Sequence, residues 1–133
     1  MKLLLAILAL SSAMHAQTLM VDSFALPDAP QPRFLTFENK VEISAFAGLV
    51  AADAITTQIG LNQGLREANP VMRPFVTRGA AGQAAGSALG FGVGVGAVYL
   101  LHRTHHYKAE RVTMRLLLAG ESGFVANNIV AIR

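Results

Sequence analysis

Three apolar segments alternate with polar ones from about residue 36 to the C terminus. They cover about residues 41–61, 79–101 and 112–132, close to the roughly 20 residues that a transmembrane helix needs. Backbone groups inside a bilayer must bond to one another, so these segments are predicted to be helices. The pattern therefore predicts an all-α protein, in which residues 39–133 form a membrane bundle of three transmembrane helices.

The first sixteen residues, MKLLLAILALSSAMHA, have the pattern of an export signal. A basic start is followed by an apolar core, residues 3–10, which is too short to span a bilayer comfortably. We expect this signal peptide, residues 1–16, to be cleaved after Ala16 or after Ala13, with its retention as an anchor as the alternative. Residues 17–38 then form a proline-containing tether.

The polar segments between the predicted spans carry turn and capping signals. Thr36 or Asn39 is expected to cap the first helix. The connector, residues 62–78, contains two prolines and predicts a short interfacial helix over residues 70–76. Glu67 is expected to accept hydrogen bonds from backbone donors at the start of that helix, where the helix dipole favours an anion.

The composition agrees with a membrane location. Hydrophobic residues make up 53% of the 133 positions and charged residues 14%, whereas soluble domains have about 25% charged residues. The absence of cysteine excludes disulfides and thiolate chemistry. A net charge of +3 could suit nucleic acid, but no nucleic-acid-binding module is visible and basic loops beside spans are ordinary. We expect a multi-pass protein of the cell (inner) membrane that contacts the lipid bilayer and no nucleic acid.

The second segment, residues 79–101, contains two rows of small residues at four-residue spacing. An interior glycine costs a helix about 1 kcal/mol relative to alanine in water, which disfavours the alternative of a soluble helical bundle. In a bilayer, small residues instead let another helix approach closely. The partner is another helix of the chain, a second copy in a homo-oligomer or another membrane protein. The helix-packing row is Gly82, Gly86, Gly90 and Gly94, and the row beside it is Ala80, Ala84, Ala88, Gly92 and Gly96.

Polar side chains recur in and beside the first and third segments. Asp53, Thr56 and Thr57 have the spacing of one helical face. A carboxylate at membrane depth is costly and by default suggests a functional site. We nevertheless expect a buried structural network that locks the helices together, with a chemical or transport role as the alternative. We expect Glu121 and one asparagine to face Asp53 and Thr57 inside the bundle. The polar cluster comprises Asp53, Thr56, Thr57, Glu67, Asn69, Glu121, Asn127 and Asn128.

Three short motifs resemble a family of small bacterial multi-pass membrane proteins of unknown function. They are Asp-x-x-Thr at a helix end, Gly-x-x-Glu-x-Asn-Pro in a connector and a late Asn-Asn pair. The stretch VTRGAAGQAAGSALG and the turn HRTHHYK are similar to an acidobacterial branch of that family. The resemblance covers about residues 36–133 and implies a multi-helix membrane protein without implying an activity. The motifs fall on Asp53, Thr56, Thr57, Gly64, Glu67, Asn69, Pro70, Asn127 and Asn128.

A histidine-rich stretch, HRTHHYKAER, follows the second segment. If a helix continued through it, His102, His106 and Glu110 would share a face and could present ligands to Zn²⁺. A solvated or headgroup-facing turn is the alternative, and the neighbouring basic residues favour it, so we predict no metal and no cofactor. The candidate ligands for a metal are His102, His105, His106 and Glu110.

The sequence contains no recognisable catalytic motif. Ser122 lies in GESGF, which is not a nucleophile motif because no strand precedes it. We interpret the chain as a non-enzymatic membrane protein with a structural or interaction role through its glycine face. One alternative is a small intramembrane proton or ion handler that uses Asp53 and Glu121. Another is a metal-dependent membrane enzyme built on the turn from His102 to His106.

Overall fold

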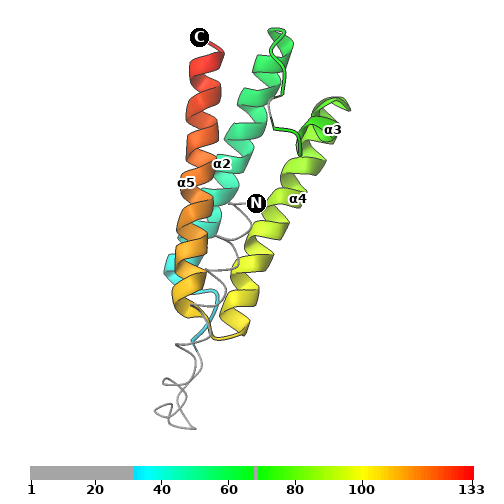
Figure 1. Ribbon diagram of the computed structural model, residues 1–133. Coiled ribbons are helices and arrows are strands. Elements are labelled where there is room, and N and C mark those ends of the chain that lie inside the picture. Colours follow the sequence, from blue (N-terminus) through cyan, green and yellow to red (C-terminus); the bar gives the residue numbers. More distant parts are fainter. Residues whose placement is uncertain (1–31, 68) are drawn as a thin grey trace, which may run out of the picture. The chain divides into compact units, whose positions relative to one another are not determined.

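A computed structural model of the chain describes residues 32–67 and 69–133 (Figure 1). The predicted signal peptide, residues 1–16, and the tether as far as residue 31 lie outside the described residues. The described part contains helices and no strand, which confirms the all-α class. Its helices are α2 (Phe37–Asn62), α3 (Arg73–Val76), α4 (Gly79–Arg103) and α5 (Tyr107–Ala131).

Helix α2 begins and ends with recognisable backbone signals. Thr36, one of the two predicted caps, has an extended backbone, and its hydroxyl oxygen accepts a hydrogen bond of 3.2 Å from the Asn39 N–H. This bond satisfies one of the backbone donors that the first helical turn leaves free. Beyond the last turn, Gly64 has a φ of 88°. This left-handed conformation suits glycine and lets the chain leave the helix for the connector.

The connector forms a shorter helix than the sequence predicts. Helix α3 has four residues, and Pro74 lies in its first turn, where a missing N–H costs nothing. Before the helix, the Asn69 side-chain oxygen accepts a hydrogen bond of 3.0 Å from the Val71 N–H. This side-chain turn occupies the residues that were predicted to begin the helix, because asparagine competes locally for the backbone donors.

Helix α5 begins at Tyr107, earlier than the predicted boundary at residue 112. Its first turns are polar, with Lys108 exposed and Glu110 buried. The predicted span starts where the apolar residues begin, whereas the helix also includes these polar turns, in which the Glu110 side chain is buried. Helices α4 and α5 are separated by a tight turn in which His105 has a φ of 61°.

The three long helices pack against one another, and α3 packs against α4 (Figure 1). Helices α2 and α5 are parallel, because Asn39 contacts Glu110 near their first turns and Asp53 contacts Asn128 further along. Helix α4 runs antiparallel to both. The C terminus therefore lies at the same end as the connector, and the histidine turn lies at the opposite end.

The core is small and draws one side chain from each long helix. Phe46, Val98 and Met114 are each 2% exposed and form a single cluster. Many large apolar side chains of the same helices are exposed instead, including Leu89 and Val93 of α4. Among the described residues, two helices, α2 and α4, are long and apolar enough to cross a membrane. Two such helices are weak evidence of a membrane location.

Candidate functional site

A cleft of about 1170 Å³ lies between α2, α4, α5 and the connector. It occupies the part of the bundle away from the histidine turn. The structure brings together here all the members of the predicted polar cluster, although they come from three separate segments of the chain. The polar lining from that cluster is Asp53, Thr56, Thr57, Glu67, Asn69, Glu121, Asn127 and Asn128.

The side chain of Asn128 connects α5 to α2. Its Nδ2 donates to Asp53 Oδ1 at 2.9 Å and to Thr57 Oγ1 at 3.0 Å. A longer contact of 3.3 Å reaches Thr56 Oγ1, and the Thr56 hydroxyl itself donates back to the Ala52 carbonyl at 2.9 Å. One amide group therefore holds the face of α2 that carries the carboxylate.

Three carboxylates line the cleft, and they act on one another. Asp53 is half-buried and experiences electrostatic repulsion from Glu67, and Glu121 experiences repulsion from Asp53. Within residues 32–67 and 69–133 none of the three forms an ion pair. The Glu121 Oε2 atom is buried and has no hydrogen-bond partner in this part of the chain. Buried polar atoms are nearly always bonded, so this oxygen is an exception. The other oxygen of Glu121, Oε1, is not buried and accepts no hydrogen bond within the described residues, so it is open to a donor in the cleft.

The connector holds its own acidic residue in place. Glu67 Oε1 accepts a hydrogen bond of 2.7 Å from the Asn69 N–H. The Arg73 guanidinium donates to the Glu67 backbone carbonyl at 3.1 and 3.3 Å. Glu67 was predicted to accept hydrogen bonds from backbone donors at the start of a helix. It instead accepts one from a backbone donor in the turn that precedes α3. These bonds fix the wall of the cleft that the connector provides.

The glycines of the predicted packing row have different surroundings. A Cβ on Gly86 would lie 2.8 Å from Phe75 Cγ and 3.0 Å from Met72 Cε. A Cβ on Gly82 would collide with the Phe75 carbonyl oxygen, so both glycines admit the connector and α3 rather than a long helix. Gly94 is where long helices meet, since its Cβ would lie 3.1 Å from Phe46 and 3.3 Å from Leu117. Gly90 lines the cleft and has nothing within 4 Å of a Cβ.

Polar residues outside the predicted cluster also line the cleft, and the sequence interpretation overlooked Gln83. Gln83 of α4 is 2% exposed, accepts a long contact of 3.5 Å from Gln58 Nε2 and donates to Ser87 Oγ at 3.4 Å. A lone glutamine among rows of glycine and alanine was the available signal for it. Arg66 also lines the cleft and is itself exposed.

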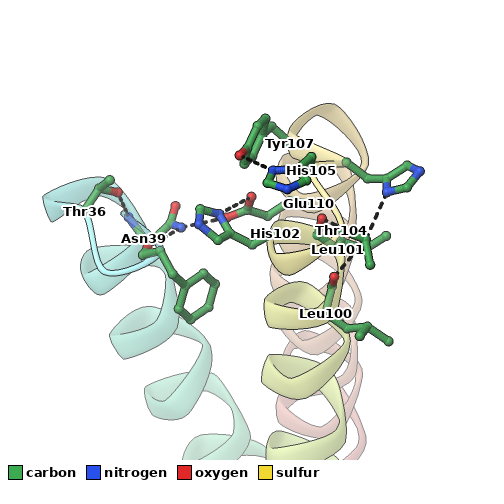
Figure 2. A network of polar contacts seen from close by, with 11 residues as sticks. Thr36, Asn39, Leu100, Leu101, His102, Thr104, His105, Tyr107 and Glu110 are labelled. Atoms are coloured by element: carbon green, nitrogen blue, oxygen red, sulfur yellow. Dashed lines mark hydrogen bonds and ion pairs between the residues drawn. The ribbon is translucent and has the colours of Figure 1, made fainter. Parts of the chain in front are cut away.

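A second polar network fastens the opposite end of the bundle (Figure 2). Glu110 of α5 is 5% exposed, and its two carboxylate oxygens have different partners. Asn39 Nδ2 donates to Oε1 at 2.8 Å, and His102 Nδ1 hydrogen-bonds to Oε2 at 2.9 Å. Since Asn39 also donates to the Phe34 carbonyl at 2.7 Å, this network ties together the first turn of α2, the end of α4 and the start of α5.

The histidine turn does not continue as a helix, so the shared face of His102, His106 and Glu110 that a continuous helix would give is not formed. His105 Nδ1 lies 2.9 Å from the Tyr107 hydroxyl in an exposed contact (Figure 2). His106 Nδ1 lies 2.9 Å from Thr104 Oγ1, and this contact is also exposed. The positive φ of His105 reverses the chain between α4 and α5. In the described part of the chain, no three histidine, cysteine or acidic side chains gather closely enough to hold a metal ion.

The fold and the cleft define an all-α protein with two helices that could cross a membrane. Residues 44–133 match a family described as a domain of unknown function, DUF5658, and the chain belongs to this family. The matched range includes every residue that lines the cleft. The predicted resemblance to a family without an assigned activity is confirmed to this extent. No curated protein and no solved structure matches the chain.

Proposed function

We propose that all three long helices cross the cell membrane, with α5 as the third span and residues 1–16 as the export signal. Helix α5 is less apolar than α2 and α4 because it carries more polar side chains. Two of these, Asn128 and Glu121, line the cleft, so they would not need to face lipid. The apolar windows of α2 and α4 are each only 17% buried, so they do not resemble helices of a soluble core. The stretch VTRGAAGQAAGSALG and the turn HRTHHYK support placing the chain in the acidobacterial branch of the family.

The sidedness of single cysteines tests this architecture, because the chain has no cysteine of its own. Gln63→Cys in the connector and Arg133→Cys at the C terminus should react with an impermeant maleimide from one side of sealed vesicles. Arg103→Cys at the end of α4 should react only from the other side. If Arg133→Cys were labelled together with Arg103→Cys, α5 would not cross the membrane and the three-span proposal would fail.

We further propose that the chain is a cation-binding membrane protein and that its site is the cleft at Asp53 and Glu121. The observation that carries this proposal is the set of three carboxylates that share one cleft without an ion pair among the described residues. A network with only a structural role would be expected to satisfy its buried polar atoms, and Glu121 Oε2 is not satisfied. A cation in the cleft would supply the missing positive charge. Cation binding involves no chemical reaction, so this proposal agrees with the interpretation of the chain as a non-enzymatic protein.

Carbodiimide labelling of carboxyl groups in membranes tests the cation site. Dicyclohexylcarbodiimide, an apolar reagent, should modify Asp53 and Glu121 faster than Glu38, which is 53% exposed at the other end of the bundle. A cation that occupies the cleft should slow the first two reactions by at least about tenfold at a hundredfold excess over its Kd and leave Glu38 unaffected. If sodium, potassium, calcium and alkylammonium ions all failed to protect Asp53 and Glu121, the proposed function would be overturned.

A further inference from the structure

The size of the cleft and the spacing of its acidic groups limit the kind of cation that fits. Divalent metal ions such as Ca²⁺ take six to eight oxygen ligands at short range. The described residues hold no group of three acidic or histidine side chains close enough for this. At about 1170 Å³ the cleft is instead somewhat larger than the sites that take drug-sized molecules, which measure about 300–1,000 Å³. A bare ion would leave most of this volume without a protein or ligand contact.

The walls of the cleft are apolar as well as acidic. Leu65 of the connector, Phe91 of α4 and Phe124 of α5 line the same space as Asp53 and Glu121. An aromatic face attracts a cation, and an apolar wall favours an alkyl chain over water. The combination suits a ligand that has a cationic head and an apolar body.

Two carboxylate oxygens that are open to the cleft distinguish between kinds of organic cation. Asp53 Oδ2 and Glu121 Oε1 are not buried and accept no hydrogen bond within the described residues, so a head with N–H groups can donate to both. A primary ammonium has three such donors, whereas a quaternary ammonium has none. Asp53 receives its donor on one carboxylate oxygen from Asn128, and its charge remains uncompensated by any ion pair of the described residues.

We infer that the cleft binds a primary ammonium group carried on an apolar chain, with the ammonium between Asp53 and Glu121 and the chain against Leu65, Phe91 and Phe124. This inference rests on the proposed function and names the class of ligand for that site. A free amphipathic amine and the ethanolamine headgroup of a membrane lipid share this chemistry. Either source places the ammonium at the same two carboxylates.

Thermal unfolding of the full chain in an uncharged detergent, followed by circular dichroism, tests the inference. Octylammonium chloride should raise the unfolding midpoint by roughly 5 °C at saturation. Octyltrimethylammonium of equal charge and chain length should raise it less than half as much, and sodium or calcium chloride should not raise it. Added phosphatidylethanolamine, compared with phosphatidylcholine, distinguishes a lipid source from a free amine. Stabilisation by octylammonium or by phosphatidylethanolamine supports the inference.

Substitutions locate the effect. Glu121→Gln should abolish most of the octylammonium shift, while Glu38→Gln at the opposite end of the bundle should leave it unchanged. If Glu121→Gln proved too unstable to measure, Asp53→Asn would serve, because it keeps a partner for Asn128. An equal shift in wild type and in both cleft variants would overturn the inference. Stabilisation by sodium or calcium alone would overturn the ammonium class but keep the cation site, and the absence of every carboxylate-dependent shift would overturn both.

Discussion

Replacing Gly86 with leucine is expected to lower the unfolding midpoint of the detergent-solubilised protein by roughly 10 °C. Even a single Cβ at this position would lie 2.8 and 2.9 Å from atoms of Phe75, and leucine adds three more carbon atoms. Overpacking of this kind costs about 1–3 kcal/mol, and about 2 kcal/mol corresponds to such a fall in a domain of this size. Phe75 and α3 would have to move off α4, which would also deform the connector wall of the cleft.

Gly92→Leu provides the matched control for Gly86→Leu. Gly92 is exposed, belongs to the same helix and has nothing within 4 Å of a Cβ. Its substitution should therefore leave the midpoint within about 2 °C of wild type, since isolated surface changes seldom exceed 0.5 kcal/mol. The native mass in detergent is measured alongside. A fall in mass with Gly86→Leu would show that this glycine mediates self-association, and an unchanged midpoint would show that Phe75 does not pack on it.

Asn128→Leu is expected to lower the midpoint by roughly 5 °C. The substitution removes the donor that reaches Asp53 and Thr57 from α5, and it leaves a half-buried carboxylate without this partner. Loss of one partner from a buried polar pair costs about 1–3 kcal/mol in soluble proteins, whereas interhelical hydrogen bonds within membranes average about 0.6 kcal/mol. We therefore expect a loss of about 1 kcal/mol, which corresponds to this shift.

The neighbouring residue supplies the control for Asn128. Asn127 lines the cleft, but it is exposed, and within the described residues its side chain makes no hydrogen bond. Asn127→Leu should therefore change the midpoint much less than Asn128→Leu. If the two substitutions lowered the midpoint equally, the loss of stability would come from removing any polar side chain here and not from the contact of Asn128 with Asp53.

The helical class follows from the sequence because each apolar segment has the length of a span and no segment alternates like a strand. The pairing of Asp53 with an asparagine of the third segment could also be anticipated, since polar groups inside apolar helices need each other as partners. The structure places Asn128, rather than Asn127, at Asp53. This choice depends on the rotation of α5, which the sequence pattern does not determine.

Other features depend on tertiary contacts that leave little trace in the sequence. Helix α3 is too short to have a periodicity, so its packing against Gly82 and Gly86 could not be foreseen, and nor could the cleft that its position helps to form. The reversal at His105 uses a left-handed backbone that histidine adopts only occasionally. Glu110, which was a candidate metal ligand in the sequence, is a buried partner of His102 and Asn39.

The rate at which a cysteine in the cleft reacts with charged reagents tests most directly whether the cleft attracts cations. Asn127→Cys places the only thiol of the chain in the cleft, and Val93→Cys places it on α4 at a side chain that is 64% exposed and outside the cleft. At position 127 a cationic methanethiosulfonate should react at least about tenfold faster than an anionic one, because three carboxylates line the same cleft. Asp53→Asn should reduce this ratio, and position 93 should show no such preference. Equal rates for the two reagents at position 127 would contradict the cation site.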